Sequence, residues 1–252
     1  MKIISYNVNG IRAALNKGFA KWLSEESPDI LCLQELKALP EQVPNFYSEL
    51  GYEMYWETAI KKGYSGVGIL TKKTPKRIVN GCGNELYDNE GRVIRADYED
   101  FSVMCVYMPS GTAGDIRQDF KYEWLDFFFN YAQEVRKECP NLVICGDYNI
   151  AHHPIDIHNP VSNKKSSGFL PEERAWLTKY IESGFIDSFR YFNSEPHHYS
   201  WWSYRANSRA NNKGWRIDYL MATEEMRTRL TSGSILPDVK HSDHCPIMLE
   251  ID

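Results

Sequence analysis

The stretch that most limits how this chain can fold is residues 142–152, which read LVICGDYNIAH. Its first four residues are apolar and predict a buried strand, and Gly146 lets the backbone bend at its end. Asp147 and Asn149 follow two residues apart, and in an extended segment such residues point to one side. A carboxylate and an amide that share one opening suit a hard cation and a phosphoryl oxygen. A plain turn is the alternative, because Gly-Asp and Asn are common turn formers.

Length and composition favour one domain over residues 1–252. Of the 252 residues, 42% are hydrophobic and 13% aromatic, so the chain can fill a large core without disulfides. The six cysteines include no CxxC pair, and most lie in apolar runs, which indicates reduced core thiols. We find no signal h-region and no apolar run of about 20 residues. We therefore expect a cytoplasmic monomer that does not contact a membrane.

Short apolar runs recur along the chain, as strands do. The six that stand out are residues 3–6, 30–33, 103–107, 142–145, 217–221 and 245–251. Further strands are predicted at residues 52–56, 67–71, 77–80 and 93–97. Helical periodicity predicts helices at residues 13–25, 39–50, 116–138 and 171–182. Two sheets with helices outside fit this inventory better than a barrel or a simple doubly wound fold.

Polar side chains lie at the ends of these predicted strands. After three early strands come Asn7 and Asn9, then Glu35, and then Asp147 with Asn149. Two late strands carry such groups at their start, namely Asp218, and Asp243 with His244. All these groups can meet only if the late strands run antiparallel to the early ones. The sequence therefore predicts mixed sheets with one functional rim.

Four positions could do chemistry, and each has a simpler interpretation. Glu35 could hold a divalent metal, although a polar strand end is usually just solvated. His244 beside an acid can be held in one tautomer, but most lone histidines are structural or exposed. Tyr107 could place a phenol at the rim, although a core tyrosine is the commoner case. Asp218 lies inside an apolar strand, where an unpaired carboxylate is costly, so we expect it to have a partner.

A basic, aromatic segment precedes the predicted strand at residues 217–221. The net charge of -5 argues against a histone-like binder, yet residues 197–217 contain four basic residues and no acidic one. Residues 199–215, YSWWSYRANSRANNKGW, interleave rings with cations, a mixture that combines stacking or wedging with phosphate neutralisation. Residues 163–168, NKKSSG, add groups that fit a phosphate backbone. An ordinary solvated loop is the alternative for this second run.

Seven motifs in this chain resemble, in order, those of the exonuclease III-like apurinic/apyrimidinic endonucleases. They are SYNVNGIRA (5–13), LQELK (33–37), VYMPSG (106–111), GDYNIAH (146–152), NPVSNKKSSGF (159–169), YSWWSYRANSRANNKGWRIDY (199–219) and SDHCP (242–246). The resemblance runs from end to end. It implies the fold of the DNase I-like superfamily, a four-layer α/β/β/α sandwich of two mixed sheets packed face to face with helices outside.

The resemblance also implies a metal site and catalytic roles. Glu35 would be the main ligand of Mg²⁺, with Mn²⁺ as an alternative ion. The full implied metal set is Asn7, Glu35, Asp147, Asn149, Asp243 and His244. Asp147 would align or deprotonate the attacking water, and Asn149 would orient the water or the phosphate. Tyr107 and His244 would contact the scissile phosphate, and Asp218 would hold His244.

The basic runs and the resemblance together predict DNA binding through a further set of side chains. This set is Arg117, Asn163, Lys164, Trp202, Arg205, Arg209, Asn212 and Trp215. Within it, Asn163, Trp202, Asn212 and Trp215 would line the DNA and the abasic-sugar pocket. The implied partner is double-stranded DNA with abasic sites or blocked 3′ ends.

The implied reaction is magnesium-dependent hydrolysis of the phosphodiester 5′ to an abasic site, which leaves a 3′-hydroxyl. Additional 3′-phosphodiesterase, 3′-phosphatase or 3′-to-5′ exonuclease activity is compatible with it. Whether Asp147 acts as a base stays open, because a free aspartate has a pKa of about 3.9, burial raises it and a neighbouring Mg²⁺ lowers it. The alternatives are a phosphatase or phosphodiesterase acting on a lipid or inositol phosphate, and a non-catalytic DNA-binding protein.

Four positions depart from the pattern of this family, and one of them, Leu36 in place of the usual threonine, has little consequence. Asn9 stands where vertebrate relatives carry an acid, which weakens the case for a second metal ion. Ser110 stands where relatives often carry Asn or Gln, which leaves the balance between abasic-site cleavage and 3′-end trimming open. Arg205 lies where a methionine wedge occurs in the family, so that here a cation would probe the duplex.

Overall fold

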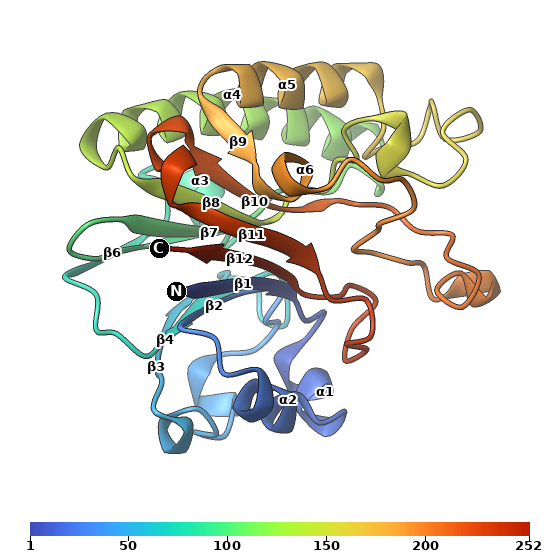
Figure 1. The fold of residues 1–252 in the computed structure, drawn as a ribbon. Helices are drawn as coiled ribbons and strands as arrows, with labels where there is room; N and C mark the ends of the chain where they lie inside the picture. The colour runs from blue at the N-terminus through green and yellow to red at the C-terminus, as the bar shows by residue number, and fades with distance from the viewer.

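Two six-stranded sheets form the centre of the computed structural model, which describes residues 1–252 (Figure 1). The first sheet contains β1 (Lys2–Asn7), β2 (Ile30–Gln34), β3 (Glu53–Glu57), β4 (Val67–Thr71), β11 (Leu230–Ile235) and β12 (Ile247–Ile251), in the order β11-β12-β1-β2-β4-β3. The second sheet contains β5 (Arg77–Asn80), β6 (Val93–Asp97), β7 (Ser102–Tyr107), β8 (Leu142–Asp147), β9 (Phe185–Asp187) and β10 (Asp218–Thr223), in the order β5-β6-β7-β8-β10-β9.

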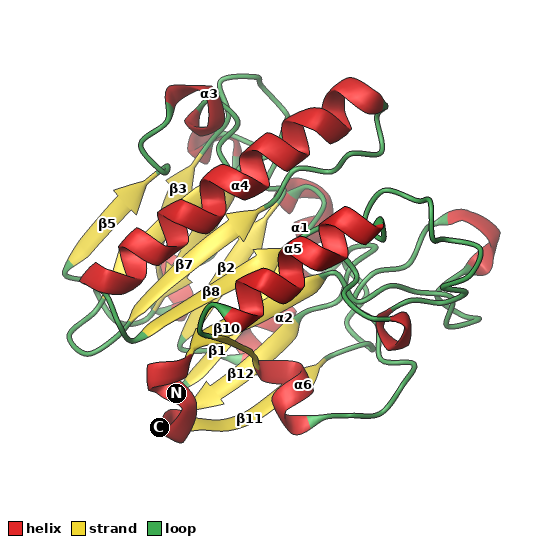
Figure 2. Ribbon diagram, turned by 90° about the horizontal axis from the view of Figure 1, so that it is seen from above, coloured by secondary structure: helices red, strands yellow, loops and turns green.

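Helices cover the outer faces of both sheets. The long helix α4 (Asp115–Glu138) and α5 (Pro171–Glu182) lie across the second sheet (Figure 2), and α1 (Ile11–Asn16) and α2 (Phe19–Glu26) lie on the far side of the first. The shorter elements are α3 (Glu85–Asp88), α6 (Ser188–Phe192), η1 (Pro40–Gln42), η2 (Ser48–Leu50), η3 (Pro154–Asp156), η4 (Arg205–Asn207) and η5 (Glu224–Arg229). No helix combines the length and the apolar character that crossing a membrane requires.

Three apolar cores separate the four layers. The central core lies between the sheets and includes Cys32, Cys105 and Cys145. A second core joins the second sheet to α4 and α5, where the rings of Trp124 and Phe128 stack with centroids 4.8 Å apart. Full burial of a side chain such as Phe128 stabilises the fold by roughly 1.5–3 kcal/mol. The third core lies under α1 and α2. The predicted four-layer sandwich is confirmed, and all six cysteines are free thiols.

Strand direction brings the polar strand ends to one rim. The central pairs β1-β2 and β7-β8 are parallel, so their carboxyl ends lie at the same edge of each sheet. Strand β10 is antiparallel to β8, and β12 is antiparallel to β1, so the starts of these late strands lie at that edge too. The predicted antiparallel direction of the late strands is therefore confirmed.

Two predicted helices are wrong. The helix expected over residues 13–25 is split into α1 and α2, because Gly18 takes a left-handed conformation with φ of 93° between them. The helix expected over residues 39–50 is replaced by η1 and η2, since Pro40 and Pro44 lack N–H donors and Pro44 disfavours helical geometry at its neighbour. The sequence analysis also missed β9, β11, α3 and α6, which are short or, in β11, contain Ser and Gly.

Gly146 is required by the close approach of β7 to β8. Its φ is 147°, and a Cβ atom at this position would lie 1.8 Å from the carbonyl oxygen of Val106. Because Val106 faces Gly146 in the parallel ladder, the clash would be with backbone that cannot move aside without breaking the register. The glycine therefore allows β8 to deliver Asp147 at the rim.

We expect Gly146→Ala to lower the free energy of unfolding by about 2–4 kcal/mol, since overpacking and backbone strain add. Urea denaturation followed by circular dichroism measures this loss. Gly51→Ala is the control, because Gly51 also has a positive φ, 80°, but no atom lies within 4 Å of its added Cβ. It should lose only about 1 kcal/mol. Equal losses in the two variants would contradict the close approach.

Candidate active site

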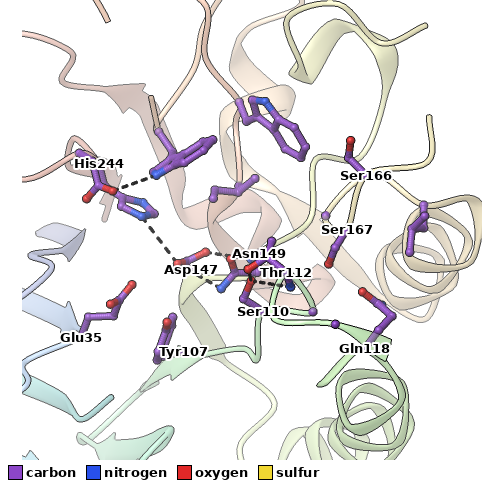
Figure 3. Close-up of a pocket in the computed structure, with 18 of the residues that line it drawn as sticks. Glu35, Tyr107, Ser110, Thr112, Gln118, Asp147, Asn149, Ser166, Ser167 and His244 are labelled. Carbon is purple, nitrogen blue, oxygen red and sulfur yellow. Dashed lines mark hydrogen bonds and ion pairs between the residues drawn. The ribbon is translucent and has the colours of Figure 1, made fainter. Parts of the chain in front are cut away.

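Three side chains from different strand ends meet in one cleft. Glu35 follows β2, Asp147 ends β8 and His244 precedes β12, and one ligand atom from each lies within 4.8 Å of the other two (Figure 3). The cleft has a volume of about 840 Å³. Glu35, Asp147 and His244 lie close together in the structure, as predicted. The first and the last of them are about 210 positions apart in the chain.

Asn7 connects the two carboxylates through its amide nitrogen. Its Nδ2 donates to Glu35 Oε1 at 2.8 Å and to Asp147 Oδ2 at 2.9 Å. Its Oδ1 accepts from the backbone N–H of Asn9 at 3.0 Å and is thus turned away from both acids. In this orientation Asn7 positions the carboxylates, and a role as an oxygen ligand would require the amide to rotate by half a turn.

Lys37 is a member of this cluster that the sequence analysis missed. Its Nζ lies 2.6 Å from Glu35 Oε2 and donates to Asn9 Oδ1, also at 2.6 Å. Both Glu35 and Lys37 have a positive φ, so the turn after β2 is tightly constrained. Burial raises the pKa of Glu35, but the ammonium of Lys37 and the Asn7 hydrogen bond outweigh it and hold the pKa below its usual value. The sequence signal for this ion pair is the lysine that ends the LQELK motif, two residues after Glu35.

His244 and Asp218 form a buried hydrogen-bonded pair. His244 Nδ1 lies 2.9 Å from Asp218 Oδ2, which also accepts from Ser200 Oγ at 2.6 Å. Burial alone would lower the pKa of His244, but the charge and hydrogen bond of Asp218 outweigh it and, with Asp147 and Asp243, raise the pKa to about 10. The imidazole is therefore protonated at neutral pH. A ring protonated on both nitrogens can donate hydrogen bonds but offers no lone pair to a cation.

Asp147 and Asn149 share the opening by a different geometry from the one predicted. Strand β8 ends at Asp147, and Asn149 has a left-handed φ of 52°, so the segment is a turn and not an extended strand. The Asn149 backbone N–H donates to Asp147 Oδ1 at 2.8 Å, and its Nδ2 donates to Met108 O at 2.9 Å. Burial raises the pKa of Asp147 to about 7 against the opposing charge of His244.

Asp243 and Tyr107 complete the polar side of the cleft. Asp243 accepts from Asn9 Nδ2 at 2.9 Å through one oxygen and from Trp201 Nε1 at 3.1 Å through the other. Tyr107 lies under the Arg92 guanidinium, 4.7 Å from the ring centroid. Burial raises the pKa of the Tyr107 phenol well above 10, so the hydroxyl stays protonated and can donate a hydrogen bond.

An apolar wall faces these groups. It consists of Trp201, Trp215 and Ile217, and the two indoles meet edge to face with centroids 6.0 Å apart. Trp215 lines the cleft, whereas Trp202, also predicted to line the pocket, does not. Trp202 is only 3% exposed and points away, with its Nε1 donating to Asn212 Oδ1 at 3.1 Å. The sequence analysis missed Trp201 and Ile217.

The predicted DNA-binding cations fall into two groups. Arg205 and Lys164 are exposed. Arg209 instead donates to the carbonyls of four residues, and Arg117 forms an ion pair with Glu90, so both guanidiniums have internal partners. These four carbonyls belong to Pro237, Val239, Ser242 and His244. Among the predicted amides, Asn212 is exposed beside Trp202, and Asn163 closes its own loop by donating to His158 O at 3.0 Å.

The match to the Endonuclease/Exonuclease/phosphatase family spans residues 4–244, and the chain belongs to this family. It is 43% identical to an exodeoxyribonuclease of Bacillus subtilis (strain 168), with all of both chains covered. It is 41% identical to a DNA-(apurinic or apyrimidinic site) endonuclease of Dictyostelium discoideum, covering 100% of this chain and 71% of that one. A 3′ phosphatase from Neisseria bound to a product DNA hairpin superimposes with a TM-score of 0.93 at 27% identity, covering 100% and 99% of the two chains.

Removal of the Asp218 carboxylate should lower the pKa of His244. We expect Asp218→Asn to reduce it by about 1–3 units, because the charge and hydrogen bond that oppose burial are lost. NMR titration of the imidazole protons in the metal-free protein measures this pKa, which is about 10 in the unaltered protein. The contribution of this pair to stability is present below about pH 6.5 and is lost as the pH rises through 10. An unchanged titration curve would contradict the pairing.

Proposed function

We propose that this protein is a DNA repair hydrolase that cleaves the phosphodiester 5′ to an abasic site in duplex DNA. Activity on 3′-blocked ends, as a 3′-phosphodiesterase, 3′-phosphatase or 3′-to-5′ exonuclease, forms part of the proposal. The observation that carries it is the joint presence, in one cleft, of the Glu35, Asp147 and His244 cluster and the apolar wall of Trp201 and Trp215. The names of the similar nucleases support it.

The donor set fits a hard divalent cation. Four acidic side chains, Glu35, Asp147, Asp218 and Asp243, adjoin two basic ones, Lys37 and His244, so the acidic groups outnumber the basic ones by two. We propose that Glu35 and Asp147 hold Mg²⁺, for which Mn²⁺ can substitute, because hard cations prefer carboxylate oxygens. When bound, the ion would neutralise charge on the scissile phosphate and lower the pKa of water. The oxygens of Asp243, like those of Glu35 and Asp147, already have protein donors.

The residues around this site have complementary tasks in the proposed reaction. Asp147 and Asn149 orient the attacking water; burial raises the pKa of Asp147 toward that of a general base, and a bound cation would lower this pKa again. The imidazolium of His244 and the phenol of Tyr107 donate hydrogen bonds to the phosphoryl oxygens, where negative charge develops. Asp218 keeps the imidazole charged and oriented.

The apolar wall supports an abasic substrate. A deoxyribose without a base presents a small, largely apolar surface, which can lie against the indoles of Trp201 and Trp215.

The free thiols support the proposed cytoplasmic setting, since disulfides are rare there. The rival lipid or inositol-phosphate hydrolase would share the polar cluster and could also use exposed cations, since its substrate is anionic too, so the similar nucleases are what favour DNA. A non-catalytic binding protein would not need the buried pair of Asp218 and His244.

The purified protein should nick an end-labelled duplex that carries one abasic site when Mg²⁺ is present. EDTA should abolish nicking, and added Mg²⁺ should restore it. Asp147→Asn should lower turnover by about 10²–10⁴-fold, because water is no longer aligned or deprotonated. Asp126→Asn, at an exposed acid of α4 that does not line the cleft, is the control. Duplexes with a 3′-phosphate nick or a recessed end, and a phosphoinositide, are assayed alongside. Hydrolysis of the phosphoinositide alone would select the rival function.

Binding of the abasic duplex should weaken steeply with salt. Each phosphate that a cation neutralises contributes about -0.9 to the slope of log affinity against log salt concentration. Arg205→Ala and Lys164→Ala should each make this slope shallower by about one such step. Lys137→Ala, at an exposed lysine near the far end of α4, should leave it unchanged. Fluorescence anisotropy in EDTA measures the slope. Identical slopes in all variants would remove both cations from the interface.

A further inference from the structure

A buried lysine–glutamate pair lies directly behind the cleft. Lys121 of α4 and Glu173 of α5 form a salt bridge, and both side chains are 0% exposed. Removing two charges from water costs several kcal/mol per ion, and well-packed apolar residues often give equal or greater stability. The contacts of the pair, which lead to two different parts of the cleft, point to a role other than stability.

Lys121 holds the turn that carries Asn149. Its Nζ donates to the backbone oxygen of Asn149 at 2.8 Å. This residue adopts the left-handed conformation, which is sparsely populated without such support. With its carbonyl fixed from below, the amide of Asn149 is directed to Met108 O, and its N–H to Asp147 Oδ1. Lys121 thereby fixes the orientation of Asn149 relative to Asp147 without entering the cleft.

Glu173 holds the loop of residues 163–168 on the opposite side. Its Oε2 accepts from the N–H groups of Gly168 and Leu170, at 2.6 and 3.0 Å. The Gly168 carbonyl in turn accepts from Ala151 N at 2.7 Å. A Cβ added to Gly168 would lie 3.1 Å from the Trp215 ring, so this end of the loop is pressed against the apolar wall. Ser166 and Ser167 of the same loop line the cleft (Figure 3).

We propose that Lys121 and Glu173 are a pair of positioning residues. They fix the turn of residues 147–149, here called the catalytic turn, and the loop of residues 163–168 relative to each other. Neither residue touches the substrate. The ammonium acts through Asn149, and the carboxylate acts through Gly168. The inference rests on the proposed nuclease function, because phosphodiester hydrolysis is its readout. It predicts that loss of the pair impairs the reaction even where the fold remains stable.

The test is the double substitution Lys121→Met with Glu173→Met, which removes both charges and leaves no buried ion unpaired. We expect its melting temperature to fall no further than that of Arg95→Met, since three backbone groups lose a partner but no ion is left unpaired. We expect kcat on the abasic duplex to fall by about 10- to 100-fold, the effect of losing hydrogen bonds to charged groups, and KM to rise as the loop is released. Lys121→Arg keeps a cation that can reach both partners, and it should retain kcat within about threefold.

Arg95→Met is the matched control. Arg95 is 2% exposed and pairs with Asp97 and Glu138. Glu138 lies 17 residues along α4 from Lys121, or about 25 Å away. This variant should lose stability and keep kcat. The inference is overturned if the double variant keeps both kcat and KM, or if kcat falls with melting temperature alike in the double variant and Arg95→Met.

If the double variant does not fold, Lys121→Met is compared with Lys121→Arg at low temperature, and equal kcat values would overturn the inference. If the unaltered protein cleaves no DNA substrate, the proposed function fails. An active protein whose variants are unaffected overturns only the positioning role.

Discussion

The rim of this protein is organised by the need to hold like charges close together. At an effective dielectric constant of about 20, two carboxylates 4 Å apart repel by about 4 kcal/mol. The repulsion is limited by two neighbouring cations, Lys37 and His244, and by the bridging amide of Asn7. Burial remains the main cause of the raised pKa of Asp147, and the charges of Asp218 and Glu35 add to it. A divalent cation would offset what these groups leave unbalanced.

The fold supplies the rigidity that such a site requires. Asn7 ends a strand of the first sheet and Asp147 ends a strand of the second, so their hydrogen bond joins the two sheets at the rim. Each strand end is fixed by its ladder and by the core between the sheets, which leaves little freedom to relax the repulsion. The close packing of Gly146 against β7 fixes the position of Asp147 at the rim.

The parts of the site that were predictable from the sequence are those that strand periodicity governs. Glu35, Asp147 and His244 adjoin apolar runs, and parallel or antiparallel pairing then brings them together. Trp201 could not be distinguished from Trp202, because adjacent residues point to opposite sides and only the bridges of Trp201 to Trp215 and His244 decide which faces the cleft. The role of Arg209 depends on carbonyls about 30 residues further on, which no local pattern reveals.

An acidic chain can accommodate the proposed polyanionic substrate because its charges are arranged at different depths. The excess negative charge lies inside the cleft, where a cation would neutralise it, whereas Arg205, Lys164 and Lys165 are exposed on the two long loops. At physiological salt, charges separated by more than about 8 Å of solvent are largely screened. A phosphate backbone at the loops would therefore respond to the local cations and not to the net charge of -5. The pair of Lys121 and Glu173 connects the loop of residues 163–168, which carries Lys164 and Lys165, to the turn that carries Asn149.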